Sequence, residues 1–334
     1  MTTRIGINGF GRIGRTYLRA ALAGGADVEV VAVNDLTDAG TLATLLEWDS
    51  VNGHFGGVAV EDDGLRVADR VIKVFSEPEP ARIPWGEVGA DVVIDATGFF
   101  TDREKAAEHL RGGARKVIVS APAKGDVPTF VLGVNDDRLD VSAADVFSNG
   151  SCTTNSLAPL AKVLNDVVGI ETGLMTTVHA YTGDQRLHDA PHRDLRRARA
   201  AAESIVPTSS GAARAIGLVI PELDGRLTGA ALRVPIPVGS ITDLTVVASR
   251  RTTAGEVNDA FREAAASGSL AGYLQYSEAP IVSRDIVGNP HSSIFDAPLT
   301  EVMGDQVKVF GWYDNEWGFS NRMLDTTVAL MNAK

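Results

Sequence analysis

The sequence predicts a two-domain α/β protein, in which a doubly wound parallel sheet is followed by an α+β domain with a mainly antiparallel sheet. Three observations lead to this fold class. Strand-like and helical segments alternate over roughly the first 150 residues, as is typical of parallel sheets. A glycine-rich turn joins the first strand to the first helix. Longer strands with few helices between them occupy most of the second half, which favours antiparallel pairing.

The composition limits the size and setting of the protein. With 334 residues, of which 44% are hydrophobic and 22% charged, the chain can form two domains with substantial cores. A single cysteine excludes an intrachain disulfide and favours a reducing, cytoplasmic setting. The net charge of −12 argues against nucleic-acid binding. We also expect no signal peptide and no membrane-spanning segment, because the chain lacks a sufficiently long apolar run.

The first domain is expected at residues 1–150. Strands are predicted at 4–8, 28–33, 71–75, 91–96 and 116–120, and a hairpin at 58–67 should turn at Asp63-Gly64. A helix should follow Gly14 and stop at Gly24-Gly25, and another should open at a Thr101-to-Glu104 capping box. In a parallel sheet, ligands bind at the carboxyl ends of the strands. We therefore expect a binding site where these strands end.

The first turn carries the pattern of a dinucleotide-binding fingerprint. Gly9 suits the tight turn, Gly11 lets a pyrophosphate approach the helix N-terminus, and Gly14 lets helix and strand pack closely. An acid, Asp35, follows about 20 residues later, where it can bind ribose hydroxyls and repel a 2′-phosphate. The alternative is a glycine-rich turn with an incidental acid. The pattern predicts a Rossmann-type domain that binds NAD rather than NADP. Further candidate cofactor residues are Arg12, Ile13, Thr97, Gly98 and Ser120.

Cys152 is the best candidate for a nucleophile. A β-prone segment precedes it and a long helical pattern follows, so it should lie where a strand turns into a helix. Free N–H groups and the helix dipole at such a position favour a thiolate. Hydroxyls at Ser151, Thr153 and Thr154 surround it in the sequence. The alternative is a buried structural cysteine, which is the commoner role of a free thiol.

A histidine and two arginines complete the candidate site. His179 follows a predicted strand at 172–178, so it could take the proton of the Cys152 thiol. Three other histidines lie in polar segments, and composition alone does not choose among them. Arg197 and Arg233 could bind an anion, although an ordinary salt bridge is the alternative for any single arginine.

The second domain is expected at residues 151–316. Further strands are predicted at 227–234, 241–247 and 307–313, and a helix at 256–266 after a Thr253-to-Glu256 box. The segment 183–200 is polar and rich in arginine, with a short helical turn expected in it. A last helix, at about 317–334, should pack back on the first domain.

Six motifs together resemble one family. They are INGFGRIG at 7–14, SCTTN at 151–155, HAYT at 179–182, DLRRAR at 194–199, LRVP at 232–235 and WYDNEWG at 312–318. Nearly end to end, the chain resembles the phosphorylating glyceraldehyde-3-phosphate dehydrogenases. The resemblance implies a glycolytic enzyme, a homotetramer, that converts D-glyceraldehyde 3-phosphate, NAD and inorganic phosphate to 1,3-bisphosphoglycerate. No metal is implied.

The resemblance also implies roles for the residues already singled out. Cys152 would attack the aldehyde to form a hemithioacetal, with His179 as general base. Hydride would pass to the nicotinamide, which Asn315 orients, and inorganic phosphate would then cleave the thioester. Thr182 and Arg233 would hold the substrate phosphate. The attacking phosphate would be held by Ser151, Thr153, Arg197, Ser210 and Gly211.

Other functions are consistent with parts of this pattern. An erythrose-4-phosphate dehydrogenase would hydrolyse the same thioester, but the segment 205–213 resembles the phosphorylating enzymes. A semialdehyde dehydrogenase would lack the HAYT motif. A scaffold without chemistry would not need the intact Cys152 and His179. Gly150, Ser156 and Phe319 depart from the residues common in the family, which suggests an isoform adapted to resist thiol-reactive inhibitors or oxidants.

Overall fold

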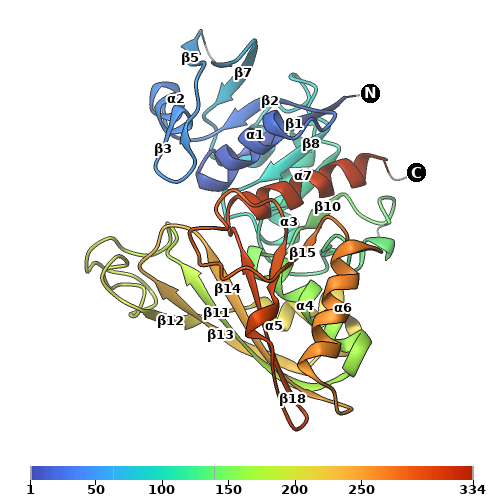
Figure 1. Cartoon of the computed structure of the whole chain (residues 1–334). Helices are drawn as coiled ribbons and strands as arrows, with labels where there is room; N and C mark the ends of the chain where they lie inside the picture. Colours follow the sequence, from blue (N-terminus) through green and yellow to red (C-terminus); the bar gives the residue numbers. More distant parts are fainter. Residues whose placement is uncertain (1, 63, 139, 333–334) are drawn as a thin grey trace. The chain divides into compact units, whose positions relative to one another are not determined.

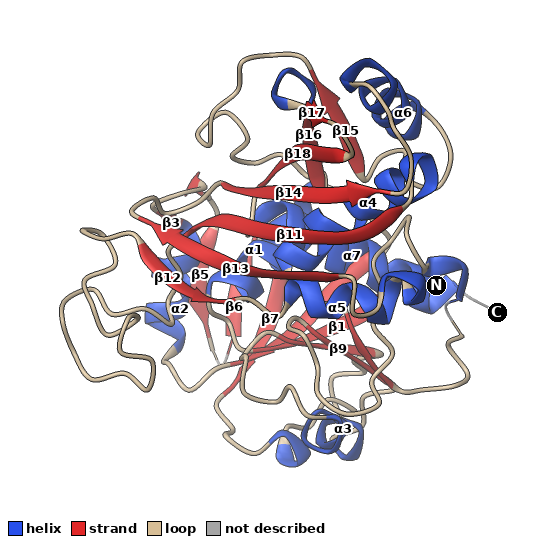
Figure 2. Cartoon of the chain, turned by 90° about the horizontal axis from the view of Figure 1, so that it is seen from below, coloured by secondary structure: helices blue, strands red, loops and turns tan. Residues whose placement is uncertain are grey.

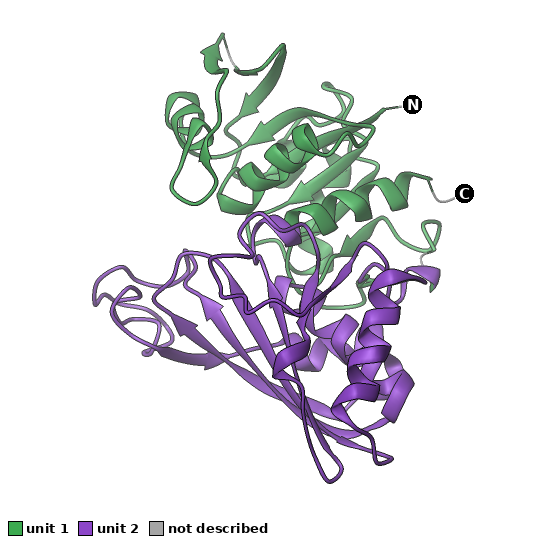
Figure 3. Cartoon of the chain, in the orientation of Figure 1, with its two compact units in different colours: residues 1–130, 138–150, 320–334 green, residues 131–137, 151–319 purple. Residues whose placement is uncertain are grey.

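The computed structural model describes residues 2–62, 64–138 and 140–332, and these residues form two compact units. Unit 1 contains the described residues of 1–130, 138–150 and 320–334, and unit 2 those of 131–137 and 151–319 (Figure 3). The predicted fold class is confirmed, because a sheet with mainly parallel pairing occurs in unit 1 and a mostly antiparallel sheet in unit 2.

The sheet of unit 1 has the order β10-β9-β8-β1-β2-β7-β6-β5 (Figure 1). Its parallel strands are β1 (Thr3–Asn8), β2 (Val28–Asn34), β7 (Arg70–Phe75), β8 (Val92–Asp95), β9 (Lys116–Val119) and β10 (Val146–Ser148). The strands β5 (Val58–Glu61) and β6 (Gly64–Val67) extend it with antiparallel pairing. Since β2 and β8 flank β1 on opposite sides, the strand order reverses beside β1, and ligands bind at such a point.

Helices cover this sheet. They are α1 (Arg12–Ala23), α2 (Ala39–Glu47), α3 (Arg103–Arg111) and most of α7 (Trp317–Asn332). Unit 1 also contains a two-stranded ribbon of β3 (Trp48–Asp49) and β4 (Gly53–His54) and a 3₁₀ turn, η1 (Pro80–Arg82). The side chains of β8 are all buried, as a strand covered on both faces requires. The hydroxyl of Tyr17 on α1 lies 3.0 Å from that of Thr327 on α7, so these two helices are in contact within unit 1.

The sheet of unit 2 has the order β12-β13-β11-β14-β18-β16-β15, with β17 paired to β18. Its strands are β11 (Ile170–Ala180), β12 (Val206–Ser209), β13 (Leu227–Val234), β14 (Ser240–Ala248), β15 (Leu274–Ser277), β16 (Ser293–Asp296), β17 (Glu301–Met303) and β18 (Gln306–Tyr313). Two neighbouring pairs, β11–β13 and β15–β16, are parallel, and the others are antiparallel.

One face of this sheet packs on helices, as Figure 2 shows. They are α4 (Cys152–Val168), α5 (Ala212–Val219) and α6 (Ala254–Ala266), and the short 3₁₀ turns are η2 (Asp136–Arg138), η3 (Pro221–Leu223) and η4 (Ala297–Leu299). Leu157, Leu160 and Leu164 of α4 are fully buried in a core shared with Leu244 and Val309 of the sheet. This packing fixes α4, and with it the position of its first residue, against the strands that carry the rest of the site.

Two local predictions were wrong. The N-cap of α3 is Asp102, whose carboxylate accepts the N–H of Glu104, and not Thr101. Gly64 pairs with Glu61 in the ladder, so it belongs to β6 and not to the turn, and Asp63 lies outside the described residues. The short helical turn expected in 183–200 is present, since the N–H of Ala198 donates to the carbonyl of Asp194 at 3.1 Å, and the rest of this segment consists of turns, bends and irregular backbone.

Candidate functional site

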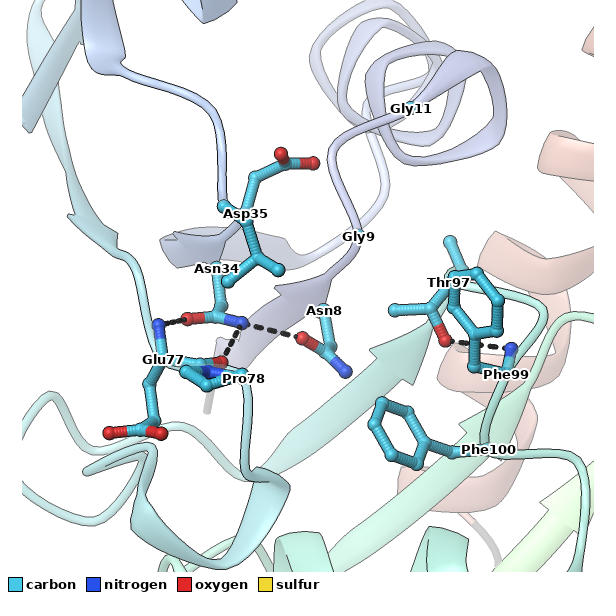
Figure 4. A pocket seen from close by; sticks show the side chains of 12 residues that line it. Asn8, Gly9, Gly11, Asn34, Asp35, Glu77, Pro78, Thr97, Phe99 and Phe100 are labelled. Carbon is cyan, nitrogen blue, oxygen red and sulfur yellow. Dashed lines mark hydrogen bonds between the residues drawn. The ribbon is translucent and has the colours of Figure 1, made fainter. Parts of the chain in front are cut away.

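A pocket of about 360 Å³ opens at the carboxyl ends of β1, β2 and β8 in unit 1 (Figure 4). Predicted cofactor residues among its lining are Gly9, Gly11, Asp35 and Thr97, joined by Asn8, Asn34, Leu36, Glu77, Pro78, Ala96, Phe99 and Phe100. The predicted residues Arg12, Ile13, Gly14, Gly98 and Ser120 are not in this lining. Arg12 instead pairs with Asp49 at 2.6 Å, and the N–H of Ser120 bonds the carbonyl of Asp95.

The glycines of the turn have distinct physical roles. Gly9 has a φ of +87°, and a Cβ on it would lie 2.8 Å from the backbone nitrogen of Thr97. A Cβ on Gly14 would lie 2.3 Å from the carbonyl oxygen of Gly9. A Cβ on Gly11, in contrast, would meet no described atom within 4 Å, and no side chain caps α1 there. The N-terminus of α1 is therefore open to an anionic group such as a pyrophosphate.

Asp35 is held in place at the end of β2. Its Oδ2 accepts the N–H of Phe10 at 2.8 Å, and its Oδ1 accepts the N–H of Thr37 at 3.0 Å. Since Phe10 belongs to the glycine-rich turn, the carboxylate and the turn have a fixed relative position. A negative charge fixed at the pocket wall suits ribose hydroxyls and opposes a 2′-phosphate.

A buried hydrogen-bond chain, which the sequence did not predict, supports the pocket from behind. The indole of Trp85 donates to Nδ1 of His109 at 3.0 Å, so Nε2 of His109 carries the proton that faces Oδ2 of Asp95 at 3.0 Å. The same Oδ2 accepts from the amide of Asn8 at 3.0 Å. Oδ1 of Asp95 accepts the hydroxyl of Thr97 at 2.7 Å. Asp95 thus orients two residues that line the pocket.

In unit 2, Cys152 is the first residue of α4. Ser151 caps the helix by accepting the N–H of Thr154 at 3.0 Å. The sulfur of Cys152 lies 3.4 Å from Nε2 of His179 at the end of β11. The other ring nitrogen, Nδ1, donates to the carbonyl of Ala180 at 2.7 Å, which leaves Nε2 as the acceptor facing the sulfur. The structure therefore brings together the predicted nucleophile and base.

Burial opposes charge on both groups. It raises the pKa of the Cys152 thiol, while the charge of Arg233 and hydrogen bonds from Thr153 act in the opposite direction. Burial, followed by the charge of Arg233, lowers the pKa of His179 to about 3. Desolvation therefore opposes the helix N-terminus, which was predicted to favour a thiolate at Cys152. Since the pair is within 3.4 Å and shares one proton, the two groups titrate together.

Arg233 lies directly across from His179 in the parallel pair of β11 and β13. Its Nη1 donates to the hydroxyl of Thr182 at 2.8 Å and to the carbonyl of Ala180 at 3.3 Å. Its Nε is buried and has no hydrogen-bond partner among the described residues. A buried cationic donor without an acceptor suits an anion, so the geometry fits a phosphate at this point.

Arg197 joins the same network through a residue that sequence reasoning missed. Its Nη1 donates to Asp184 at 2.7 Å, and the hydroxyl of Thr182 donates to the other oxygen of Asp184. Its Nε donates to the hydroxyl of Thr208 on β12 at 2.8 Å. Asp184 was detectable as an acid two residues after Thr182, whereas Thr208 comes close only through the pairing of β12 with β13.

The remaining predicted anion ligands lie at two helix starts. Ser151 and Thr153 flank Cys152 at the start of α4, and the hydroxyl of Thr153 lies 2.8 Å from that of Tyr313. Gly211 is the N-cap of α5, and Ser210 accepts the N–H of Ala212 at 3.3 Å. Among the described residues, no side-chain hydrogen bond joins Ser210 or Gly211 to Cys152.

Asn315 lies between β18 and α7. Its carboxamide oxygen accepts from the N–H of Gly239 at 3.1 Å and from the hydroxyl of Ser240 at 3.0 Å. Its nitrogen end is therefore the end that remains to bind a ligand carbonyl. Among the described residues there is no group of three metal-ligating side chains. No helix in the described part of the chain is long and apolar enough to span a membrane.

A Rossmann-type pocket on one unit and a cysteine–histidine pair beside arginine-bound hydroxyls on the other are typical of NAD-dependent dehydrogenases that act through a thiol. Residues 3–103 match the family model described as the glyceraldehyde 3-phosphate dehydrogenase NAD binding domain, and residues 151–315 match the C-terminal domain of the same family. The chain is 62% identical over 98% of both sequences to "Glyceraldehyde-3-phosphate dehydrogenase 1" of Streptomyces avermitilis. It is also 61% identical to glyceraldehyde-3-phosphate dehydrogenases of Streptomyces arenae, over 99% of both chains, and Mycobacterium tuberculosis, over 97%.

The chain belongs to the glyceraldehyde-3-phosphate dehydrogenase family. The family resemblance and NAD as the cofactor, both predicted from the sequence, are thereby confirmed. The erythrose-4-phosphate and inhibitor-resistant alternatives are not favoured by these comparisons.

Proposed function

We propose that the cysteine–histidine pair of this chain catalyses the oxidative phosphorylation of D-glyceraldehyde 3-phosphate to 1,3-bisphosphoglycerate in glycolysis. The observation that carries the proposal is the 3.4 Å separation of Cys152 Sγ and His179 Nε2 at the start of α4. The neighbouring pair of Thr182 and Arg233 supplies a site for the phosphate of the substrate.

The chemistry follows from the positions of these groups. The sulfur of Cys152 attacks the aldehyde carbon while its proton passes to Nε2 of His179, giving a hemithioacetal. The protonated imidazole and the N–H of Cys152 stabilise the negative oxygen that forms, and the imidazole then returns the proton to this oxygen, which gives the hemithioacetal hydroxyl and a neutral His179. His179 takes the hydroxyl proton of the hemithioacetal when its carbon is oxidised to a thioester. Bound NAD supplies the hydride acceptor for that oxidation.

Inorganic phosphate completes the reaction. Its oxygen attacks the thioester carbonyl, the carbon–sulfur bond breaks, and the sulfur leaves with the proton held by His179. We assign the attacking phosphate to Arg197 together with Ser151, Thr153, Ser210 and Gly211, and add the hydroxyl of Thr208, which Arg197 contacts at 2.8 Å. The helix starts at α4 and α5 provide N–H groups suited to an anion.

We also assign the predicted cofactor residues to the parts of NAD that they would contact. Gly9 and Gly14 allow the tight turn and the close packing behind it, Gly11 leaves the start of α1 open to the pyrophosphate, and Asp35 accepts the ribose hydroxyls. Arg12, Ile13, Thr97, Gly98 and Ser120 are assigned to the surroundings of the dinucleotide, and the amide nitrogen of Asn315 to the nicotinamide carbonyl. Residues 1–150 with the helix at 317–334 would form the NAD-binding domain, and 151–316 the catalytic domain.

We also propose that the protein assembles as a homotetramer in the cytoplasm. Large apolar side chains remain exposed in unit 2: Leu174 by 66%, Leu187 by 75%, Leu195 by 82% and Ile205 by 64%. Such exposure favours association with further copies of the chain. Light scattering coupled to size-exclusion chromatography tests the assembly, and a monomer at micromolar concentration would contradict it.

The function is tested by NADH formation from glyceraldehyde 3-phosphate with and without inorganic phosphate. The proposal expects turnover that requires phosphate and that is abolished in Cys152→Ser. Turnover at equal rates without phosphate would indicate hydrolysis of the thioester instead. No turnover under either condition, in a protein that binds NAD, would exclude the proposed reaction.

A further inference from the structure

The end of the Asn315 carboxamide that faces a ligand is determined by its neighbours. The N–H of Gly239, which can only donate, lies 3.1 Å from the side-chain oxygen of Asn315. This bond assigns the oxygen end of the carboxamide, because an amide nitrogen at the same place would oppose a second donor. The hydroxyl of Ser240 donates to the same oxygen at 3.0 Å. Both acceptor positions of the oxygen are then occupied.

The direction of the Ser240 hydroxyl is also determined. The N–H of Ala180 lies 3.1 Å from Ser240 Oγ, so the serine oxygen accepts there. Its own hydrogen is consequently available for Asn315. Ser240 is fully buried, and Asn315 is only 4% exposed. Because the hydroxyl is shielded from solvent, its loss leaves the groups around it without a partner.

Ser240 also contacts the residue that orients the catalytic imidazole. Ala180 accepts from Nδ1 of His179 through its carbonyl at 2.7 Å, while its N–H bonds Ser240. One hydroxyl therefore lies between the strand end that holds the base and the amide assigned to the nicotinamide. The backbone around Asn315 is fixed separately, since the carboxylate of Asp314 accepts the N–H groups of Gly288, Glu316 and Trp317.

We propose that Ser240 is a positioning residue that keeps the amide nitrogen of Asn315 directed at the nicotinamide carboxamide of NAD. The proposal rests on the proposed function of Asn315. With Ser240 replaced by alanine, only the N–H of Gly239 still binds the side-chain oxygen of Asn315. The Asn315 carboxamide can then rotate, so that its oxygen, an acceptor, faces the carbonyl oxygen of the nicotinamide, which is also an acceptor. The effect should be confined to ligands that carry nicotinamide.

The experiment compares the binding of NAD with that of ADP-ribose, which lacks the nicotinamide. Dissociation constants are measured by calorimetry on wild type, Ser240→Ala and Asn315→Ala, each first stripped of cofactor. Loss of one hydrogen bond predicts that Ser240→Ala binds NAD about three- to tenfold more weakly. Its affinity for ADP-ribose should be that of wild type. In the Asn315→Ala background, Ser240→Ala should cause no further change in the NAD to ADP-ribose ratio.

Two controls separate this effect from general loss of structure. Ser293→Ala also removes a fully buried hydroxyl from the same sheet, where it contacts Ser156 at 3.3 Å and not Asn315. Ser293→Ala should keep the wild-type ratio of the affinities for NAD and ADP-ribose. Ser240→Cys retains the volume and a weak donor, and should give an intermediate ratio even if the alanine variant is poorly folded.

The outcomes distinguish the two proposals. If Asn315→Ala lowers the affinity for NAD and Ser240→Ala keeps the wild-type ratio, the inference about Ser240 is overturned and the role of Asn315 stands. If neither variant changes the ratio, the role of Asn315 fails, and the inference fails with it. Equal weakening of NAD and ADP-ribose in Ser240→Ala would also overturn the inference, since it would show a general structural role.

Discussion

Cys152 and His179 meet across 3.4 Å although 26 residues separate them in the chain, since α4 begins at Cys152 and His179 is the penultimate residue of β11. The helix places the sulfur, and the strand places the ring. The carbonyl of Ala180 fixes which ring nitrogen faces the sulfur. The pair is thus assembled by elements whose own packing is independent of any ligand.

Replacement of His179 by asparagine should slow the reaction of Cys152 with iodoacetamide at neutral pH by at least about tenfold. The variant lacks the acceptor for the thiol proton, while burial continues to raise the pKa of the thiol. The rate should then rise only at alkaline pH. The measurement is the pH dependence of alkylation in protein free of cofactor. Identical pH profiles for wild type and variant would contradict the coupled titration of Cys152 and His179.

Acid should destabilise the protein through His179. In the folded state its pKa is lowered to about 3, whereas the unfolded chain takes up a proton near the ordinary value of 6.5. Between these values the unfolded state holds more protons, so the free energy of unfolding falls as the pH falls below about 6.5. Between pH 7 and pH 5 the loss should be about 2 kcal/mol. Urea unfolding of wild type and His179→Asn at both pH values measures it, and parallel changes would refute the assignment.

Removal of the charge of Asp35 should relax the preference for NAD over NADP. Asp35→Asn keeps an oxygen for the N–H of Phe10 but no longer repels a 2′-phosphate, so the affinity ratio should shift by about tenfold or more toward NADP. Asp38→Asn is a matched control, because Asp38 lies three residues after Asp35, is exposed to solvent and is the N-cap residue of α2. An unchanged ratio in Asp35→Asn would show that another residue sets the preference.

Loss of the His109 side chain should cost about 1.5–3 kcal/mol of stability, since it removes the neutral imidazole that donates a hydrogen bond to the buried carboxylate of Asp95. Affinity for NAD should fall as well, because Asp95 orients Thr97. Urea unfolding and calorimetry of His109→Ala measure the two effects. Adding Asp95→Asn should restore part of the stability, and failure to do so would count against a charge effect. His54→Ala, at a half-exposed histidine, should change little.

Much of the fold could be predicted because local signals agreed with tertiary structure. Three local patterns each indicated both an element and the surface against which it packs. They are the glycine-rich turn, the fully buried strand β8 and the apolar pattern of α4. The helices α2 and α5 were not predicted. Each is short, and α5 contains a glycine at position 217 and no side-chain cap.

The site was predictable only where a motif carried its chemistry. Cys152 and His179 are unusual residues in recognisable sequence settings. Ser240 and Thr208 are ordinary hydroxyls, and they reach the site through the pairing of strands that are distant in the sequence, which a single sequence does not specify. The ionisation of Cys152 could not be predicted either, because it depends on the balance between desolvation and nearby positive charge.

The central claim is that Cys152 carries the substrate as a thioester until phosphate releases it. Mass spectrometry of protein mixed with NAD and glyceraldehyde 3-phosphate, in buffer without inorganic phosphate and quenched in acid, tests this directly. The account predicts a phosphoglyceroyl adduct on the peptide containing Cys152, which disappears rapidly when phosphate is added and is absent in Cys152→Ser. Rapid phosphate-dependent formation of NADH with no adduct at Cys152 would contradict it.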